Sequence, residues 1–176
     1  MNYRTATPSD VNQLALLHAE SWRRNYRGLF TDDFLDNEAD SNRKIVWAER
    51  LNSNSPEQFV CVADQGGKIV GFVCAYGRED NTWGSLIDNL HVAAGYQRLG
   101  IGTQLMMTTF AWLHTHYPDD SVYLWVMKKN MQARKFYEKL GASNAGVVDK
   151  PNPVGGGSAF NCRYIWPRIV SPTNPH

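Results

Sequence analysis

The sequence predicts a single α/β domain of the α+β kind. It is built on a mixed, mostly antiparallel central sheet of about 6–7 strands flanked by about four helices. Two observations carry this prediction. Three strand-like segments follow one another in the first half of the chain, and a long helix, an apolar strand and a second helix alternate in the second half. With 176 residues, the chain has the usual length of one domain.

Apolar and β-branched runs mark the predicted strands, at residues 2–6, 58–63, 69–76, 83–92, 122–127, 147–148 and 159–166. Short polar turns at 64–68 and 79–81 join the second, third and fourth of them, which predicts an antiparallel meander. The run at 122–127 is apolar throughout, as is typical of a central strand with parallel neighbours.

Cap signals and helical spacing mark the helices, at residues 7–26, around 34–35 after a cap at 31–33, and at 43–51, 100–113 and 130–140. Thr7 caps the first, and Gly141 closes the last, where a C-terminal glycine belongs. The domain is expected to span residues 1–168, with a flexible loop at 151–157 and a disordered tail at 169–176.

Charge and cysteine content exclude several functional classes. A net charge of +1, from 18 basic and 17 acidic residues, gives no support to a nucleic-acid or membrane-surface partner. No apolar run approaches the roughly 20 residues of a membrane span, and no signal region opens the sequence. Cys61, Cys74 and Cys162 have neither disulfide nor zinc spacing, so we expect buried free thiols, no metal site and a cytoplasmic location.

A glycine-bearing turn joins the strand that ends at Val92 to the helix that starts near Gly100. Free N–H groups and the helix dipole make a helix N-terminus attractive to a phosphate, and Arg98 could add a charged contact. The spacing is neither a dinucleotide fingerprint nor a P-loop, because Leu105 replaces the third glycine and no Gly-Lys-Ser/Thr follows. Taken alone, the pattern equally suits a plain strand-to-helix turn.

Two sequence blocks resemble those of the GNAT acetyltransferase superfamily. The first is Leu90-His91-Val92 followed by Gln97-Arg98-Leu99-Gly100-Ile101-Gly102, which is similar to the signature Q/R-x-x-G-x-G/A. The second is the strand 124–127, then Asn130, and then Ala133-Arg134-Lys135-Phe136-Tyr137-Glu138-Lys139-Leu140-Gly141. The residues around Ser21-Trp22 and Tyr26-Arg27-Gly28 resemble the substrate-side helix and loop of bacterial members, so the likeness runs from residue 3 to 166.

This resemblance implies a transfer of an acetyl group from acetyl-CoA directly to a bound amine. The cofactor would lie in the wedge between a splayed parallel pair, the strands at 86–92 and 122–127. The implied cofactor-binding residues are Leu90, His91, Val92, Gln97, Arg98, Leu99, Gly100, Ile101, Gly102, Thr103, Asn130, Ala133 and Tyr137. Main-chain N–H groups of residues 99–103 would take the pyrophosphate, and one near Leu90 would polarise the thioester carbonyl.

Tyr137 is the general acid that the resemblance implies. A phenol, with a pKa of about 10, can protonate a departing thiolate whose conjugate thiol has a pKa of about 8.5. The local pattern alone would also allow Tyr137 to be an aromatic core residue, since either it or Phe136 must face inward. Asn130 suits a helix cap as well as a cofactor contact.

The general base is expected at Asp88. Several family members carry a glutamate where this chain has Leu86, and Asp88 follows on the same face of a regular strand. A second family position for this acid is Trp125 here. The alternatives are that Asp88 only forms a salt bridge, or that His91 is the base, which needs a bulge to re-aim its ring.

The acceptor is expected to be a small-molecule amine. Trp22, Tyr26, Phe30 and Trp83 could enclose it, although the same pattern equally suits core residues, and His18 and Glu20 suit either the acceptor side or a solvated helix face. Two other hypotheses stay open: acetylation of a protein N-terminus or lysine, and a non-catalytic acyl-CoA-binding or sensing module. A homodimer through the apolar last strand is a further possibility.

Overall fold

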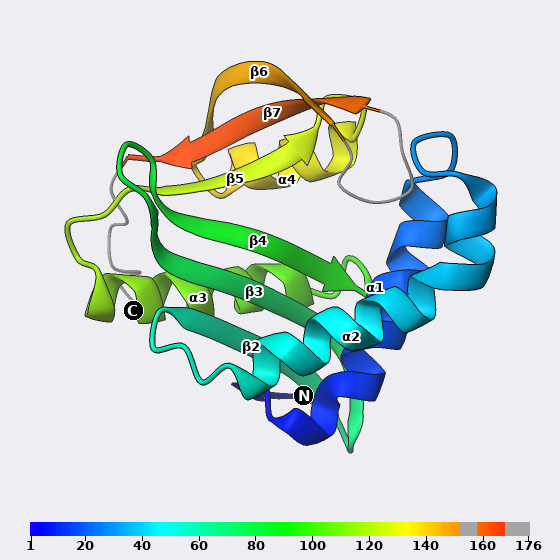
Figure 1. Ribbon diagram of the computed structural model, residues 1–176. Coiled ribbons are helices and arrows are strands. Elements are labelled where there is room, and N and C mark those ends of the chain that lie inside the picture. Colours follow the sequence, from blue (N-terminus) through cyan, green and yellow to red (C-terminus); the bar gives the residue numbers. More distant parts are fainter. Residues whose placement is uncertain (152–157, 168–176) are drawn as a thin grey trace.

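The computed structural model describes residues 1–151 and 158–167 and contains one seven-stranded sheet within them (Figure 1). Its strands are β1 (Asn2–Thr5), β2 (Gln58–Gln65), β3 (Lys68–Asp80), β4 (Gly84–Val92), β5 (Val122–Met127), β6 (Ser143–Pro151) and β7 (Ser158–Trp166). The spatial order is β1-β2-β3-β4-β5-β7-β6, and β4–β5 is the parallel pair. The predicted mixed, mostly antiparallel fold is therefore confirmed.

Helices cover both faces of the sheet (Figure 1). They are α1 (Val11–Asn25), α2 (Ala39–Asn52), α3 (Ile101–His116) and α4 (Met131–Lys139). Because successive side chains of a strand point to opposite faces, each face of the sheet has its own hydrophobic core. Val62 and Phe72 pack under α1 and α2, whereas their neighbours Cys61 and Val73 face α3. The three cysteines are free and buried, as expected.

The splayed strand pair is the feature that positions the site. β4 and β5 are paired only from Ser85 to Ile87 and from Val122 to Leu124. β4 then runs on to Val92 while β5 stays paired with β7 on its other side. The two strands therefore separate, and a wedge opens between their carboxyl ends (Figure 1).

Two predicted boundaries need correction. The separate helical pieces at 34–35 and 43–51 form one run, because a π-helical turn, η2 (Phe34–Glu38), leads directly into α2. The polar stretch 36–42 hides this from sequence, although Leu35 and Ala39 within the run are fully buried. The strand predicted at 147–148 spans residues 143–151, because pairing with β7 rather than its own pattern sets its length.

Residues 152–157 and 168–176 lie outside the described residues, and so do the predicted flexible loop and disordered tail. No helix of the described chain combines the length and apolar character that crossing a membrane requires.

Candidate active site

The turn before α3 has the geometry of an anion site. Gly100 caps the helix with φ 79°, a left-handed conformation that glycine adopts without strain, and Arg98 shares it with φ 63°. The first helical hydrogen bond runs from the Gln104 N–H to the Gly100 carbonyl at 3.0 Å. Amides of the first helical turn precede that bond and have no intrahelical partner. They therefore remain available to a ligand.

Close packing fixes this turn to the sheet. A Cβ on Gly71 of β3 would stand 3.1 Å from the Ile101 side chain and 3.2 Å from that of Leu105. A bare glycine there lets the first turn of α3 lie against the strand. The Gln97 side-chain amide also donates to the Val92 carbonyl at 3.3 Å. These contacts hold the turn against the end of β4, and we describe the two together as one unit.

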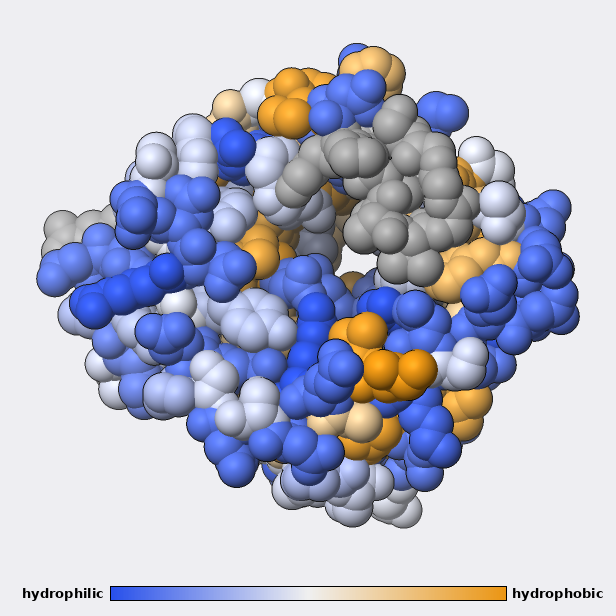
Figure 2. All heavy atoms as spheres, viewed as in Figure 1, coloured by the Kyte–Doolittle hydropathy of each residue, from blue (hydrophilic) through white to orange (hydrophobic). Residues whose placement is uncertain are grey.

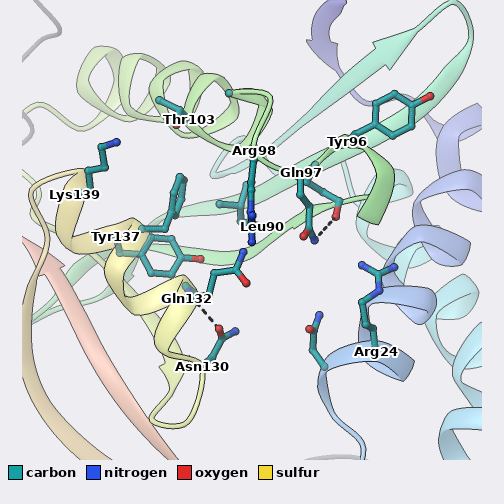
Figure 3. A pocket seen from close by; sticks show the side chains of 16 residues that line it. Arg24, Leu90, Tyr96, Gln97, Arg98, Thr103, Asn130, Gln132, Tyr137 and Lys139 are labelled. Atoms are coloured by element: carbon teal, nitrogen blue, oxygen red, sulfur yellow. Dashed lines mark hydrogen bonds between the residues drawn. The ribbon is translucent and has the colours of Figure 1, made fainter.

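A cleft of about 590 Å³ lies between this unit and α4 (Figure 3). Its lining residues are Arg24, Asn25, Leu90, Val92, Tyr96, Gln97, Arg98, Gly100, Gly102, Thr103, Asn130, Gln132, Ala133, Phe136, Tyr137 and Lys139. Three of these described residues are cationic and none is acidic. The cleft therefore carries a positive potential that suits a polyanionic ligand. We call it the cofactor cleft.

Tyr137 is buried on α4, and its hydroxyl points into the cofactor cleft (Figure 3). Burial, with a smaller contribution from Tyr26, raises the pKa of Tyr137 above that of an ordinary phenol. The hydroxyl is therefore protonated at neutral pH and able to donate a proton. Asn130 begins α4 by accepting the Ala133 N–H at 3.0 Å, so its predicted role as a helix cap is confirmed.

A second, smaller pocket of about 180 Å³ lies on the α1 side of the wedge. We call it the acceptor pocket. It shares with the cofactor cleft the residues Asn25, Leu90, Val92, Gln97, Asn130, Ala133 and Tyr137. The two spaces therefore meet where β4 and β5 separate, and Figure 2 shows this face of the molecule hollowed there. Tyr137 stands at the junction.

Asp88 lines the acceptor pocket and is the bulged residue of β4. Ile87 faces Ala75 and Asn89 faces Cys74, so Asp88 is an extra residue between two ladder positions. Its Oδ2 atom accepts from Arg50 at 2.8 Å and from the Asn89 side chain at 2.6 Å. The expected salt bridge and the lining of the pocket are thus both present.

Because of the same bulge, the side chain of His91 lies on the same face of the sheet as that of Asp88. His91 therefore lines the acceptor pocket as well. Its Nδ1 lies 2.7 Å from the Ser21 hydroxyl, which accepts from Asn25 at 3.2 Å. The serine hydroxyl can therefore donate its proton to Nδ1 while it accepts from Asn25. Burial, with a smaller effect of Arg43, lowers the pKa of His91 to about 4, so the ring is neutral at physiological pH.

His18 lies beneath His91, with the ring centroids 4.6 Å apart. The Trp47 indole N–H donates to its Nδ1 at 3.2 Å, so the neutral ring carries its proton on Nε2. Burial lowers the pKa of His18 well below its usual value. The prediction that these side chains lie on a solvated face of the first helix is therefore wrong for His18, which is 2% exposed. It is right for Glu20, which is exposed.

The structure places most of the predicted cofactor residues around the cofactor cleft. Leu99 and Ile101 do not line it, because the Leu99 side chain is 67% exposed and Ile101 is buried in the core. His91 lines the acceptor pocket alone. Tyr26 lines that pocket as well, whereas Trp83 packs on Arg163 at 3.9 Å.

Sequence reasoning missed several lining residues: Arg24, Asn25, Tyr96, Gln132 and Lys139 of the cofactor cleft, and Met127 and Asn161 of the acceptor pocket. They lie beside the motifs or far from them in the chain. Among the described residues, no cluster of three histidine, cysteine or acidic side chains is arranged to hold a metal ion.

The fold is one that solved N-acetyltransferases share. The protein is similar in fold to an N-acetyltransferase from Staphylococcus aureus Mu50, with a TM-score of 0.72 at 16% identity over 96% of this chain and 98% of that one. It is also similar to the PaiA N-acetyltransferase from Thermoplasma acidophilum, solved in complex with coenzyme A. That TM-score is 0.68, at 16% identity over 92% of this chain and 96% of that one.

Sequence comparisons identify the family. The model of the acetyltransferase (GNAT) family matches residues 18–142. A probable N-acetyltransferase of Mycobacterium tuberculosis (strain H37Rv), Rv2775, is 31% identical over 96% of this chain and 95% of its own length. The protein therefore belongs to the acetyltransferase (GNAT) family, as its motifs predict, and is an acyltransferase.

Proposed function

We propose that the protein transfers an acetyl group from acetyl-CoA to the primary amine of a small molecule, by direct attack within a ternary complex. One observation carries this proposal: a cationic cleft and an acid-bearing pocket meet through the wedge between β4 and β5, with Tyr137 at the junction. Each substrate would enter from its own side, and the reacting groups would meet at the opening.

The cofactor cleft fits coenzyme A by charge and by backbone geometry. Amides of residues 99–103 would bind the pyrophosphate, Gln97 and Arg98 would border it, and Thr103 and Ala133 would line its path. Beyond Ile87, the β4 edge is not paired with β5, so the backbone of Leu90 and Val92 is available to an amide-rich chain and to the acyl oxygen. Acetyl-CoA would supply the activated acetyl thioester.

Tyr137 acts as the general acid in this proposal, since its phenol is protonated and stands where both pockets meet. Asp88 acts as the general base. Its Oδ2 is held by Arg50 and Asn89, which leaves Oδ1 without a hydrogen-bond partner within the described chain. That oxygen would receive the proton of the amine, directly or through a water.

A small acceptor suits the acceptor pocket, whose 180 Å³ is close to the volume that holds one aromatic ring. The test is release of free thiol from acetyl-CoA with a panel of amines, a peptide N-terminus and a peptide lysine. Turnover of the peptides alone would favour a protein acetyltransferase. Acetyl-CoA binding with no turnover of any acceptor would favour a sensing module.

Two variants test the residue roles. Tyr137→Phe is expected to lower kcat about 100-fold or more, because general acids typically contribute that much. Asp88→Asn is expected to lower turnover even at saturating amine. Matched controls are Tyr117→Phe and Asp119→Asn, both outside the two pockets. Full turnover by either active-site variant would remove that residue from the mechanism.

A further inference from the structure

We infer that the acceptor is a small monoamine with a flat aromatic body, an arylalkylamine-like compound whose ammonium group is anchored at Asp88. This inference rests on the proposed N-acetyltransferase function and narrows its substrate class. It follows from the size, the charges and the walls of the acceptor pocket.

The size limits the acceptor first. An apolar cavity of about 150 Å³ holds benzene, so the pocket's 180 Å³ admits an aromatic ring with little more than a short chain. The amine nitrogen would then lie within one ring and a short linker of the junction at Tyr137. A bulky polyamine or oligosaccharide would place most of its atoms outside the pocket.

The charges limit it next. The described lining residues are Ser21, Asn25, Tyr26, Ile87, Asp88, Asn89, Leu90, His91, Val92, Gln97, Leu124, Trp125, Val126, Met127, Asn130, Ala133, Tyr137 and Asn161. Asp88 is the one charged side chain among them, since His91 is neutral. A single ammonium has a partner there. Among the described lining residues of this pocket, a carboxylate or phosphate on the acceptor meets no cation, and a second ammonium meets no second acid.

Arginines on the neighbouring elements are already engaged, as is Arg43, whose guanidinium lies 4.1 Å from the Trp22 ring centre. Arg50 holds the Oδ2 atom of Asp88. The Arg163 guanidinium lies between two indoles, 3.9 Å from the Trp83 ring centre and 4.5 Å from that of Trp125. None of these three arginines lines the acceptor pocket, so none is positioned to bind an anionic acceptor there.

The walls favour a flat body. Tyr26, His91, Trp125 and Tyr137 come from four different elements and all line the pocket. Two of these rings pack on neighbouring side chains: the Arg163 guanidinium lies 4.5 Å from the Trp125 ring centre, and Phe30 meets the Tyr26 ring edge-to-face at 5.5 Å. Packed aromatic surfaces gain most from another flat ring, which fits between them without rearrangement.

The test compares 2-phenylethylamine with L-phenylalanine, 2-aminoethyl phosphate, spermidine and n-butylamine, with acetyl-CoA saturating and free thiol as readout. We expect kcat/KM for 2-phenylethylamine to exceed that of every other compound by at least tenfold. Higher turnover of L-phenylalanine, the phosphate or spermidine would overturn the inference and leave the proposed function standing. If no compound releases thiol, calorimetric binding of 2-phenylethylamine to the CoA-loaded protein decides the inference separately: binding supports it and no binding overturns it.

A pair of variants tests whether Trp125 forms a wall of the pocket that contacts the ring of the acceptor. Trp125→Leu is expected to raise KM for 2-phenylethylamine at least tenfold while KM for acetyl-CoA stays within twofold. Trp112→Leu on α3 is the matched control, because that indole stacks on Phe59 away from both pockets. Tyr26→Leu gives a second, independent reading if Trp125→Leu does not fold. An unchanged KM for 2-phenylethylamine in a folded variant would overturn the proposed wall.

Discussion

The two sides of the wedge are built in different ways. The cofactor side draws mainly on residues 90–103 and 130–139, with Arg24 and Asn25 added by α1, and much of its proposed recognition is by main chain. The acceptor side assembles side chains from α1, β4, β5, α4 and β7, with a buried layer of His18 and Trp47 beneath them. Main-chain recognition depends on backbone shape, whereas the acceptor side depends on which side chains each element contributes.

This difference explains how changes on each side should behave. A substitution on the cofactor side alters the shape or charge of a continuous turn, so its effect should be confined to acetyl-CoA. A substitution on the acceptor side alters one member of a side-chain network, so its effect should be confined to the amine. Variants that affect both substrates equally would break the comparison.

The largest effect is expected from Gly102→Glu. This residue lies in the first turn of α3, where a Cβ would already stand 3.5 Å from Phe136. A carboxylate there would face the bound phosphates, and like charges in such contact cost several kcal/mol. We expect kcat/KM for acetyl-CoA to fall at least 100-fold. Gln104→Glu, on the same helix and exposed, adds the same charge as a control and should change it less than threefold.

A second prediction concerns Arg50, which holds Asp88 in place from α2. Arg50→Met removes that hydrogen bond, so Asp88 would lose its fixed orientation in the acceptor pocket. We expect KM for the amine to rise at least tenfold, because a hydrogen bond to a charged group is typically worth about 1.5–3 kcal/mol and about 1.4 kcal/mol corresponds to a factor of ten. KM for acetyl-CoA should stay within twofold. Arg23→Met breaks a comparable pair with Asp40 outside both pockets, and an equal effect there would contradict the specific role.

The difference between the two sides also explains how much of the site could be predicted from the sequence. On the cofactor side, the glycine at the helix start, the Asn130 cap and the apolar strand are local signals, and each predicted feature is confirmed in the fold. Gly100 illustrates why: a left-handed helix cap is a property of one position and its neighbours. The family motif lies on the same segment.

On the acceptor side, local signals are insufficient. His18 occupies an ordinary position on an amphipathic helix, and only the contacts with Trp47 and His91 reveal that it is buried. Asp88 and His91 share a face because of one bulge, whose location depends on pairing with β3. Arg24 lines the cofactor cleft only because α1 ends beside the wedge. These relations arise between distant segments, so the residues alone did not predict them.

A third prediction concerns the pH dependence of stability, which we expect to depend on His91 of the acceptor side. The pKa of His91 is about 4 in the folded protein and near 6.5 when unfolded. The unfolded chain therefore binds more protons between these values, and stability falls as pH drops from 6.5 towards 4. We expect His91→Gln, which can still accept from Ser21, to lose about 1 to 2 kcal/mol less than the native protein between pH 7 and 5. Urea unfolding at both pH values measures this, with exposed His116→Gln as the control, and equal losses would contradict it.

The smallest effect is expected at Arg24, whose neighbour Asn25 lines both pockets. Arg24 is exposed at the end of α1 and faces the cofactor cleft from the wall opposite α4 (Figure 3). Exposed charges act through solvent and are screened within about 10 Å at 0.1 M salt, so one such charge contributes well below 1 kcal/mol. Arg24→Gln should therefore raise KM for acetyl-CoA about threefold at low salt and have no measurable effect at 0.5 M salt.

KM for the amine should not change in Arg24→Gln, although α1 also supplies Ser21 and Asn25 to the acceptor pocket. The neighbouring Arg23→Met provides the control, because Arg23 lines neither pocket. A salt-independent rise in KM for acetyl-CoA would mean that Arg24 acts by packing rather than by charge. A rise in KM for the amine would mean that α1 couples the two sides, and the wedge would then separate the substrates in space without separating their binding energies.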